Sequence, residues 1–289
     1  MKVEANAKVN FTLEVFGKRA DGYHALRSVV MPISLSDTLD IEVTDDGSIT
    51  SDTGYDDDLC VKAAKALRSA RLFDCLDCSI VRLKGARISV KKRIPAGGGL
   101  GGGSADAAAV LRALDELLKI GLSREELAEI GAQVGSDVPA LVMGGPVIME
   151  GRGEKVAPIE QSNNLSNRTI HLVLVNPGVQ SSTKEVYAAC EARPLDAENA
   201  TAKMVAALRA GDVGEIAAAL MNDLQAPAVK QHPEIADALV SLRTAGVVGA
   251  MMSGSGSSVF GLVENEAEAR RISSEMNARG YKAWPVQTL

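Results

Sequence analysis

The sequence predicts an α+β fold arranged in two halves. Segments typical of strands and of helices follow one another without the regular strand–helix alternation of a doubly wound sheet. A chain of 289 residues is long enough for two ordinary domains. Residues 160–168, EQSNNLSNR, have the polar composition of a linker. We therefore expect one domain over residues 1–159 and a second over residues 160–289.

The composition restricts the classes of function. The chain is 46% hydrophobic and 24% charged, as soluble globular proteins are. Its net charge of -6 opposes binding of nucleic acid through phosphate neutralisation. The N-terminus lacks the apolar core of a signal peptide, and the uncharged run 244–263 is too rich in Gly, Ser and Thr for a membrane span. We expect a cytoplasmic protein, monomeric or homodimeric, with no nucleic-acid or membrane partner.

The four cysteines indicate no metal or redox site. Cys75 and Cys78 have a spacing found in metal sites, but no second close pair of Cys or His accompanies them. A redox pair would open a helix after a strand, whereas Cys78 leads into the strand-like SIVRL. Reduced structural cysteines, as in a cytosolic protein, are expected.

The first half begins with a clear strand pattern. Apolar residues occupy every odd position from Val3 to Val15, and period two predicts a half-buried strand. Its polar face carries Lys8, Asn10 and Thr12, which periodicity alone assigns to solvent. The further elements expected in this half are a strand over 26–43, an Asp-rich surface loop over 45–58, a helix over 58–70, two strands within 79–94, a helix over 104–119, a helix from the capping box Ser123–Glu126 to about 134, and a hairpin over 146–156.

The second half mixes strands and helices in the same way. Its expected strands cover 169–177, the two sides of SGSGS (253–257), and 281–287. Its expected helices cover 183–192, 198–210, 213–222, 232–245 and 264–279.

The stretch IPAGGGLGGGSADAAAVL, residues 94–111, places six glycines in seven positions before a helix. Amide groups without a neighbouring Cβ can close on phosphate oxygens, and the helix N-terminus adds partial positive charge. A turn alone needs only one or two glycines. The stretch therefore predicts an anion-binding loop.

Three familiar phosphate loops fit this stretch poorly. The P-loop pattern fails because Gly103, and not a lysine, precedes Ser104. A Rossmann match at Gly97, Gly99 and Gly102 is weak, since a second helix follows where a parallel strand is required. The His-Arg-Asp and Asp-Phe-Gly elements of protein kinases do not occur. What remains is a loop that holds nucleotide phosphates without a lysine of its own.

Three blocks in order resemble the motifs of the GHMP kinase superfamily: AKVNFTLEVFGKRADGYH, PAGGGLGGGSADAAAVL and MMSGSGSSVFGLV. GKRADGYHALRSVVMPISLSDTL and GSDVPALVMGGPVIMEGRGE are similar to the branch that phosphorylates cytidine diphospho-methylerythritol. The resemblance implies a two-domain architecture, N-terminal ribosomal-protein-S5-domain-2-like and C-terminal ferredoxin-like α/β sandwich, with the active site in the cleft between them.

The resemblance also implies a reaction. ATP would phosphorylate the 2-hydroxyl of cytidine diphospho-methylerythritol, in the non-mevalonate route to isoprenoid precursors, with Mg²⁺ as counter-ion. Lys8 matches the family's active-site lysine, and Asp137 matches its catalytic aspartate, which would accept the hydroxyl proton. Because Pro139 follows closely, the residues alone also allow Asp137 to be a helix cap. The resemblance identifies no metal ligand.

The residues that match the family's ATP-binding positions are Lys92, Pro95, Ala96, Gly97, Gly98, Gly99, Leu100, Gly101, Gly102, Gly103, Ser104 and Ala105. Lys92 matches a position near the adenine; otherwise it is one of three consecutive solvated cations. Ser104 could bind a phosphate oxygen or Mg²⁺, and it could equally be a helix N-cap.

The residues that match substrate-binding positions are Asn10, Tyr23, His24, Thr183 and Tyr187. His24 would supply polar contacts to the cytosine, and Tyr187 is a candidate stacking partner. Ordinary packing is the competing interpretation for either tyrosine.

Three alternatives remain at this point. The chain could be another superfamily kinase, acting on homoserine or a mevalonate-type alcohol, or a non-catalytic relative that senses sugar and nucleotide. A nucleic-acid module is the third, since the expected first-domain fold resembles a ribosomal-protein domain. The acidic charge disfavours it.

Overall fold

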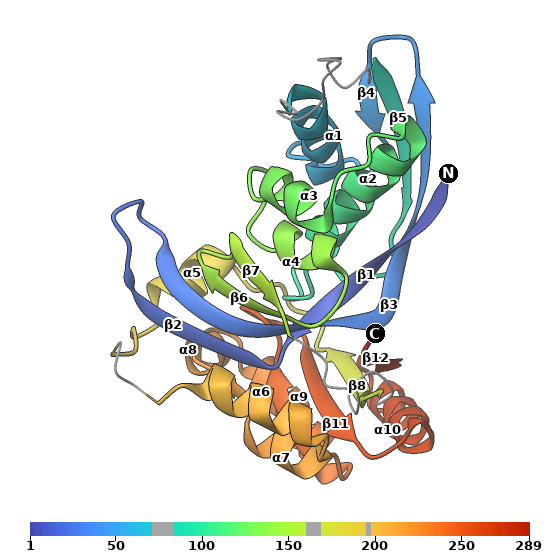
Figure 1. The fold of residues 1–289 in the computed structure, drawn as a ribbon. Coiled ribbons are helices and arrows are strands. Elements are labelled where there is room, and N and C mark those ends of the chain that lie inside the picture. Colours follow the sequence, from blue (N-terminus) through green and yellow to red (C-terminus); the bar gives the residue numbers. More distant parts are fainter. Residues whose placement is uncertain (71–83, 160–168, 195–197) are drawn as a thin grey trace. The chain divides into compact units, whose positions relative to one another are not determined.

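The computed structural model describes residues 1–70, 84–159, 169–194 and 198–289 (Figure 1). Two compact units are built from interleaved segments. Unit 1 comprises Met1–Ala7, Ser36–Ile94 and Gly101–Gly144, and unit 2 comprises Lys8–Leu35, Pro95–Leu100 and Gly145–Leu289. The expected linker at 160–168 lies outside the described residues, and the expected domain division at 159/160 stays a prediction.

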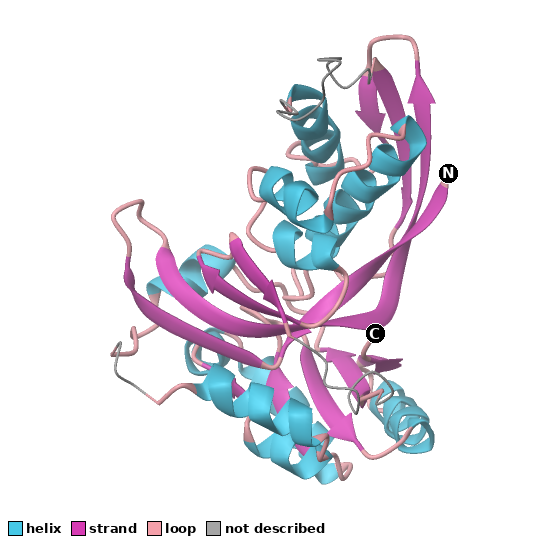
Figure 2. Ribbon diagram, viewed as in Figure 1, coloured by secondary structure: helices cyan, strands magenta, loops and turns pink. Residues whose placement is uncertain are grey.

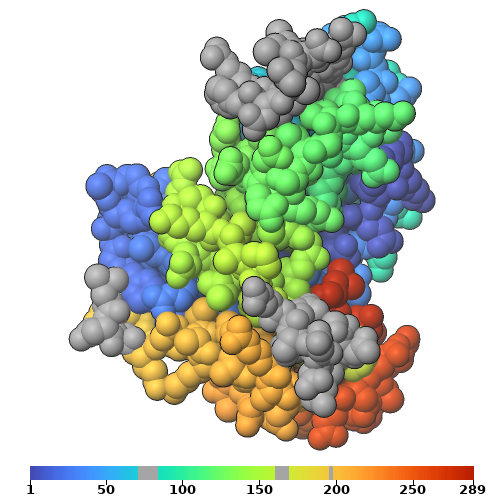
Figure 3. All heavy atoms as spheres, viewed as in Figure 1, coloured from blue at the N-terminus to red at the C-terminus, as the bar shows by residue number. Residues whose placement is uncertain are grey.

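In its described residues, unit 1 combines strands with helices (Figure 2). The second part of the long strand β3 (His24–Thr44) pairs antiparallel with β5 (Gly85–Lys91), which pairs parallel with β4 (Ile49–Ser51). Strand β1 (Lys2–Asn10) also pairs with β3. The helices are α1 (Leu59–Ser69), α2 (Gly102–Leu118), α3 (Arg124–Gly131) and α4 (Val138–Met143). Figure 3 shows the green atoms of the α2–α4 region as one continuous surface on the face drawn.

Local sequence explains where these helices begin. The side chain of Asp58 accepts hydrogen bonds from the amides of Cys60 and Val61 and so caps α1. The predicted capping box is confirmed, because Ser123 and Glu126 satisfy each other's backbone amides at the start of α3. Helix α4 was not predicted; its six residues are too few for a period of 3.6 to show.

Unit 2 contains two groups of strands. Strand β2 (Thr12–Lys18) pairs antiparallel with the first part of β3. The same part of β3 pairs with β6 (Val147–Gly151), and β6 pairs with β7 (Lys155–Pro158). A separate antiparallel sheet has the order β10 (Gly249–Met252), β11 (Val259–Val263), β8 (His171–Asn176) and β12 (Lys282–Gln287). The helices are α5 (Thr183–Ala188), α6 (Ala200–Ala210), α7 (Val213–Ala218), α8 (Gln225–Gln231), α9 (Pro233–Thr244) and α10 (Glu266–Ala278).

Several expected boundaries were wrong for tertiary reasons. The single strand expected from Val3 to Val15 is broken at Phe11, whose ring stacks on Phe260 at 5.6 Å. The helix expected over 213–222 ends at Ala218, because Met221–Asn222 forms strand β9 and pairs in parallel with β2. The Asp-rich loop contains β4, and α8 was missed.

The described helices are short, and α2, with 17 residues, is the longest of them. None of the helices in the described ranges is long and apolar enough to cross a bilayer.

Candidate active site

The part of the polar face formed by Lys8, Asn10 and Thr12 is buried, so the expectation that it is solvated was wrong. Lys8 is 3% exposed, Asn10 1% and Thr12 0%. Thr12 Oγ1 lies 3.0 Å from Thr201 Oγ1 and accepts a hydrogen bond of 2.9 Å from the amide of Val29. Period two fixes only which residues share a face; in this fold other elements of unit 2 cover both faces.

A chain of hydrogen bonds fixes the position of Lys8. Its Nζ donates to Asn10 Oδ1 at 2.7 Å, and Asn10 Nδ2 donates to Ser28 Oγ at 2.8 Å. Ser28 Oγ in turn donates to the carbonyl of Thr12 at 2.5 Å. Burying an ammonium group costs free energy because the charge loses its hydration. Buried charged groups of this kind are typical of functional sites. Asn10 thus positions Lys8, in addition to its predicted role in substrate binding.

The first part of the glycine stretch lies against the C-terminal motif. Gly98 O accepts from the amide of Ser258 at 3.1 Å, and Gly99 O accepts from Ser253 Oγ at 3.0 Å. The amide of Lys8 donates to Leu100 O at 3.0 Å. Three widely separated sequence motifs therefore meet within unit 2.

Two of these glycines are required by protein packing itself. Gly99 has φ +74°, and a Cβ there would lie 2.1 Å from the carbonyl oxygen of Ser253. A Cβ at Gly98 would lie 2.6 Å from Ser258 Oγ. The high glycine content thus has a second cause beside phosphate binding: the backbone must approach the C-terminal motif closely.

Side chains outside the predicted site hold the loop at 253–258 in place. Asn222 Nδ2 donates to the carbonyls of Met252 and Gly254, both at 2.9 Å, and the amide of Met252 donates to Gln225 Oε1 at 2.9 Å. These supporting residues were not predicted, although the block NDLQAPA that contains them is part of the family resemblance.

The predicted substrate residue Thr183 also supports this loop. Thr183 Oγ1 lies 2.8 Å from Ser255 Oγ, and Ser181 Oγ donates to Ser255 O at 2.7 Å. Thr183 thus has a structural partner, and its role toward a substrate stays a prediction.

Two of the predicted base-binding residues lie side by side. The rings of His24 and Tyr187 have centroids 5.7 Å apart with planes tilted by 31°. They come from β3 and α5, which are distant in sequence, so the pairing is a property of the fold. Tyr23 is 53% exposed, and the guanidinium of Arg152 lies over its ring at 5.6 Å. The structure therefore brings together His24 and Tyr187 and gives Tyr23 a different neighbour.

In unit 1, the second part of the glycine stretch forms the start of α2. Gly101 has φ +67° and precedes the first helical residue, Gly102. Ser104 is therefore the third helical residue, and the alternative that it is the N-cap was wrong. The first amides of a helix lack intrahelical acceptors, so the start of this 17-residue helix offers donors and partial positive charge to an anion.

Lys92 lies beside the start of α2. Its Nζ is 2.5 Å from Asp37 Oδ2 and 2.7 Å from Asp106 Oδ2, and the alternative of a solvated cation was wrong. Asp37 also accepts from the amides of Arg93 and Ile94. A Cβ at Gly102 would lie 3.5 Å from Lys92 Nζ, so the cluster of Lys92, Asp37 and Asp106 lies beside the residues where the helix begins.

Asp137 precedes α4, but its side chain makes no capping hydrogen bond. The interpretation of this carboxylate as an ordinary cap therefore lacks the hydrogen bond on which it depends. The segment that carries it lies near the first turn of α2: a Cβ on Gly135 would be 3.8 Å from Ser104 Oγ. Within unit 1, the helix start and the segment of Asp137 are thus neighbours.

Comparisons with known proteins show the family to which this chain is related. The family model described as "GHMP kinases N terminal domain" matches residues 58–145, and "GHMP kinases C terminal" matches residues 204–282. A protein of Citrifermentans bemidjiense named 4-diphosphocytidyl-2-C-methyl-D-erythritol kinase is 37% identical over 100% of this chain and 99% of its own length. One of Pelotomaculum thermopropionicum with the same name is 42% identical over 93% of this chain and 91% of its own.

The chain belongs to the GHMP kinases. A crystal structure of 4-(cytidine 5'-diphospho)-2C-methyl-D-erythritol kinase matches this GHMP kinase with a TM-score of 0.80 and 33% identity, over 100% of this chain and 99% of the other. Homoserine kinase from Cytophaga hutchinsonii matches with a TM-score of 0.76 and 19% identity over 100% of this chain and 94% of its own, which shows the shared fold alone.

Several sequence-based predictions are thereby confirmed. The α+β fold class, the family, the kinase activity and a small-molecule substrate agree with the family matches, and GHMP kinases are ATP-dependent. The residue assignments within this GHMP kinase stay predictions and are taken up below.

Within the described ranges, no group of three or more His, Cys, Asp or Glu residues could hold a metal ion. Cys60 is buried, and burial raises the pKa of its thiol, so it is unreactive, as expected of a structural cysteine. Cys75 and Cys78, and the strand expected to follow them, lie outside the described residues.

Asp106 gives this GHMP kinase a measurable pH dependence. Burial, the largest cause, raises the pKa of Asp106 from 3.8 to about 7 although Lys92 is close. The folded state therefore binds more protons than the unfolded state between these values, and its stability falls as pH rises through that window. Asp106→Asn removes this contribution, which is worth up to about 1.4 kcal/mol per pH unit.

Urea unfolding at pH 5 and pH 7.5 tests this expectation. The free energy of unfolding of Asp106→Asn should fall less between the two pH values than that of the natural protein. Asp56→Asn, at an exposed carboxylate of unit 1, should follow the natural protein. Parallel pH profiles for the natural protein and Asp106→Asn would contradict the raised pKa.

Proposed function

We propose that this kinase transfers the γ-phosphoryl group of ATP to the 2-hydroxyl of 4-diphosphocytidyl-2-C-methyl-D-erythritol, in the non-mevalonate route to isoprenoid precursors. Full-length relatives with that activity in their names support the choice of substrate. The observation that carries it is the paired rings of His24 and Tyr187, because a nucleobase needs an aromatic face and polar groups at its edge. Homoserine and mevalonate have no base, so that pair does not support these alternatives.

Positioning and charge neutralisation would supply most of the catalysis, since phosphoryl transfer asks little covalent chemistry of the protein. The amides of Gly97 to Ser104 and the start of α2 would hold the phosphate tail, and Lys92 would lie near the adenine. Lys8, fixed by Asn10, would stabilise the charge on the transferring group. Asp137 would accept the proton of the attacking hydroxyl. The remaining proposed ATP contacts are Pro95, Ala96 and Ala105.

Mg²⁺ would neutralise charge on the nucleotide phosphates. A magnesium ion carried by ATP needs only one or two protein oxygens, which is compatible with the lack of an acidic cluster among the described residues. Ser104, in the first turn of α2, carries a hydroxyl suited to this role.

The base would lie against His24 and Tyr187. Tyr187 provides a π-face and His24 a ring nitrogen for the cytosine edge. Tyr23, Asn10 and Thr183 remain proposed substrate contacts, Asn10 through the methylerythritol hydroxyls and Thr183 beside the loop at 253–258.

One kinase assay tests the proposal. ADP release is measured with the complete substrate, with methylerythritol phosphate lacking the cytidylyl group, with homoserine and with mevalonate. We expect kcat/KM for the complete substrate to exceed the others by at least about 100-fold, because a stacked and hydrogen-bonded base contributes several kcal/mol. Equal or faster turnover of a substrate without a base would contradict the proposal, and turnover of none would support a sensor instead.

His24→Ala tests the base site separately. We expect KM for the cytidylyl substrate to rise about 10-fold or more, because one stacking and hydrogen-bonding group is lost, while KM for ATP stays unchanged. His171→Ala makes the same substitution on β8 and should leave both values as they are. If His24→Ala had no effect on KM for the substrate, this ring would not be part of the base site.

The domain division at 159/160, the cytoplasmic location and the monomeric or homodimeric state are retained as proposals. No nucleic-acid partner is proposed, because the net charge of -6 provides no attraction for a polyanion.

A further inference from the structure

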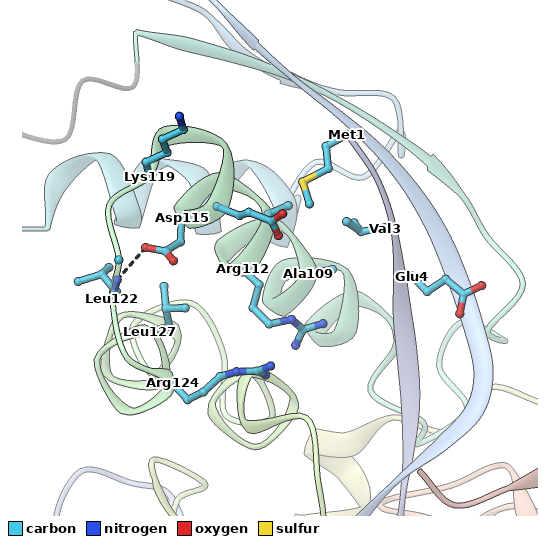
Figure 4. A pocket seen from close by; sticks show the side chains of 13 residues that line it. Met1, Val3, Glu4, Ala109, Arg112, Asp115, Lys119, Leu122, Arg124 and Leu127 are labelled. Carbon is cyan, nitrogen blue, oxygen red and sulfur yellow. Dashed lines mark hydrogen bonds between the residues drawn. The ribbon is translucent and has the colours of Figure 1, made fainter.

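Unit 1 contains a cavity to which no predicted residue contributes. It has a volume of about 740 Å³ and lies between α2, α3 and β1. Its apolar lining includes Val3, Ala109 and Leu127, and its cationic lining includes Arg112 and Arg124 (Figure 4). A concave site with an apolar wall and a few charged groups is the usual form of a small-molecule site.

The two arginines are bound to the end of α4. Arg112 Nη1 donates to Leu141 O at 2.7 Å, and Arg124 Nη1 donates to Val142 O at 2.6 Å. These carbonyls belong to the last turn of the helix, where cations are favoured. Capping occupies only the Nη1 atom of each guanidinium, so Nε and Nη2 remain as donors.

Over the described part of the chain, neither Arg112 nor Arg124 forms an ion pair. Burial, and then the charge of Arg124, lower the pKa of Arg112 to about 10. The two guanidinium groups thus repel each other at neutral pH while remaining charged, which an anion between them would relieve.

Figure 4 shows both guanidinium groups directed into the cavity, one above the other. Of the acidic residues in the lining, Asp115 is engaged elsewhere, because its Oδ1 accepts from the amide of Leu122 at 3.0 Å. Glu4 and Glu116 are exposed, and among the described residues neither forms an ion pair with the two arginines. Lys119 extends away from the arginines in the same view.

We propose that this cavity binds a small organic phosphate. Its phosphate group lies between Arg112 and Arg124, and its short apolar body packs against Val3 and Leu127. A carboxylate is satisfied by one bidentate arginine, whereas a tetrahedral phosphate presents oxygens to two guanidinium groups from different helices. The proposal does not depend on the substrate proposed above.

Calorimetric titration with n-butyl phosphate tests the site. The full chain is first saturated with a non-hydrolysable ATP analogue, so that phosphate positions in the active site are occupied. We expect one saturable site, weaker binding of inorganic phosphate because it lacks the apolar body, and no binding of n-butanol.

Arg124→Gln should weaken the binding of butyl phosphate at least about 10-fold, the usual worth of a charge-assisted hydrogen bond. Lys119→Gln removes the same charge from the same cavity lining and should change the affinity less than about two-fold, because its side chain points elsewhere. Arg112→Lys keeps the charge but loses the forked donor, and should also weaken binding.

Thermal melting of each variant shows that it is folded. Absence of saturable binding in the natural protein would overturn the proposal. So would equal weakening in Arg124→Gln and Lys119→Gln, since this would indicate general attraction of anions. Retention of full affinity by both arginine variants would overturn it as well.

Discussion

Replacing Asp137 with asparagine is expected to lower kcat by about 10²- to 10⁴-fold, the range associated with loss of a general base. Asparagine keeps the shape of the side chain but cannot accept the proton of the substrate hydroxyl. Helix α4 should still form, because the carboxylate makes no capping hydrogen bond that the substitution would remove. The affinity for ATP, measured by calorimetry, should therefore stay close to that of the natural enzyme.

Asp56→Asn is the matched control for this experiment. It makes the same chemical change at an exposed carboxylate of unit 1 and should leave turnover unaltered. A variant Asp137→Asn that retained more than about a tenth of the natural kcat would rule out a role as general base. A loss of ATP binding together with kcat would assign the carboxylate to nucleotide or metal binding instead.

Gly99→Ala is expected to destabilise the fold by about 2–5 kcal/mol, the sum of a left-handed conformation and an overpacked contact. The added Cβ would lie 2.1 Å from the carbonyl oxygen of Ser253, and neither backbone segment can move without breaking the bond from Ser253 Oγ to Gly99 O. Urea unfolding measures the loss. ATP binding should weaken in parallel, because the displaced segment is the proposed phosphate loop.

Gly54→Ala separates the two causes. Gly54 has the same φ of +74°, but a Cβ there meets nothing within 4 Å. It should therefore show only the smaller cost of the backbone conformation, about 1–2 kcal/mol. Equal losses in the two variants would mean that close approach of the C-terminal motif does not require glycine at position 99.

Local patterns in the sequence predicted most of the elements. The capping box at Ser123 places the start of α3 correctly, because both partners lie within one turn. The amphipathic pattern after the glycines likewise predicts α2, although the helix begins at Gly102 and not at Ser104. Boundaries were wrong where partners distant in sequence decide them, as at Met221–Asn222, which pairs with β2.

The same contrast between local patterns and distant contacts holds for the candidate site. The sequence located Lys8 and the glycine stretch, but period two assigned Lys8 to solvent, whereas the hydrogen bonds from Asn10 through Ser28 lie in the interior. No local signal distinguishes a solvated polar face from a buried one. Asn222 was missed for a related reason, since its importance lies in two carbonyls at residues 252 and 254 that only folding brings within reach.

By itself, the sequence determined the family, the kinase chemistry and the set of candidate residues, because short motifs retain the residue types that phosphate binding and proton transfer demand. Only the tertiary structure decided which residues are neighbours. It pairs the ring of His24 with Tyr187, joins Lys92 to Asp37 and Asp106, and directs Arg112 and Arg124 into one cavity. The physical reason is that each of these arrangements joins different elements of the fold, and its energy depends on distances that no local pattern encodes.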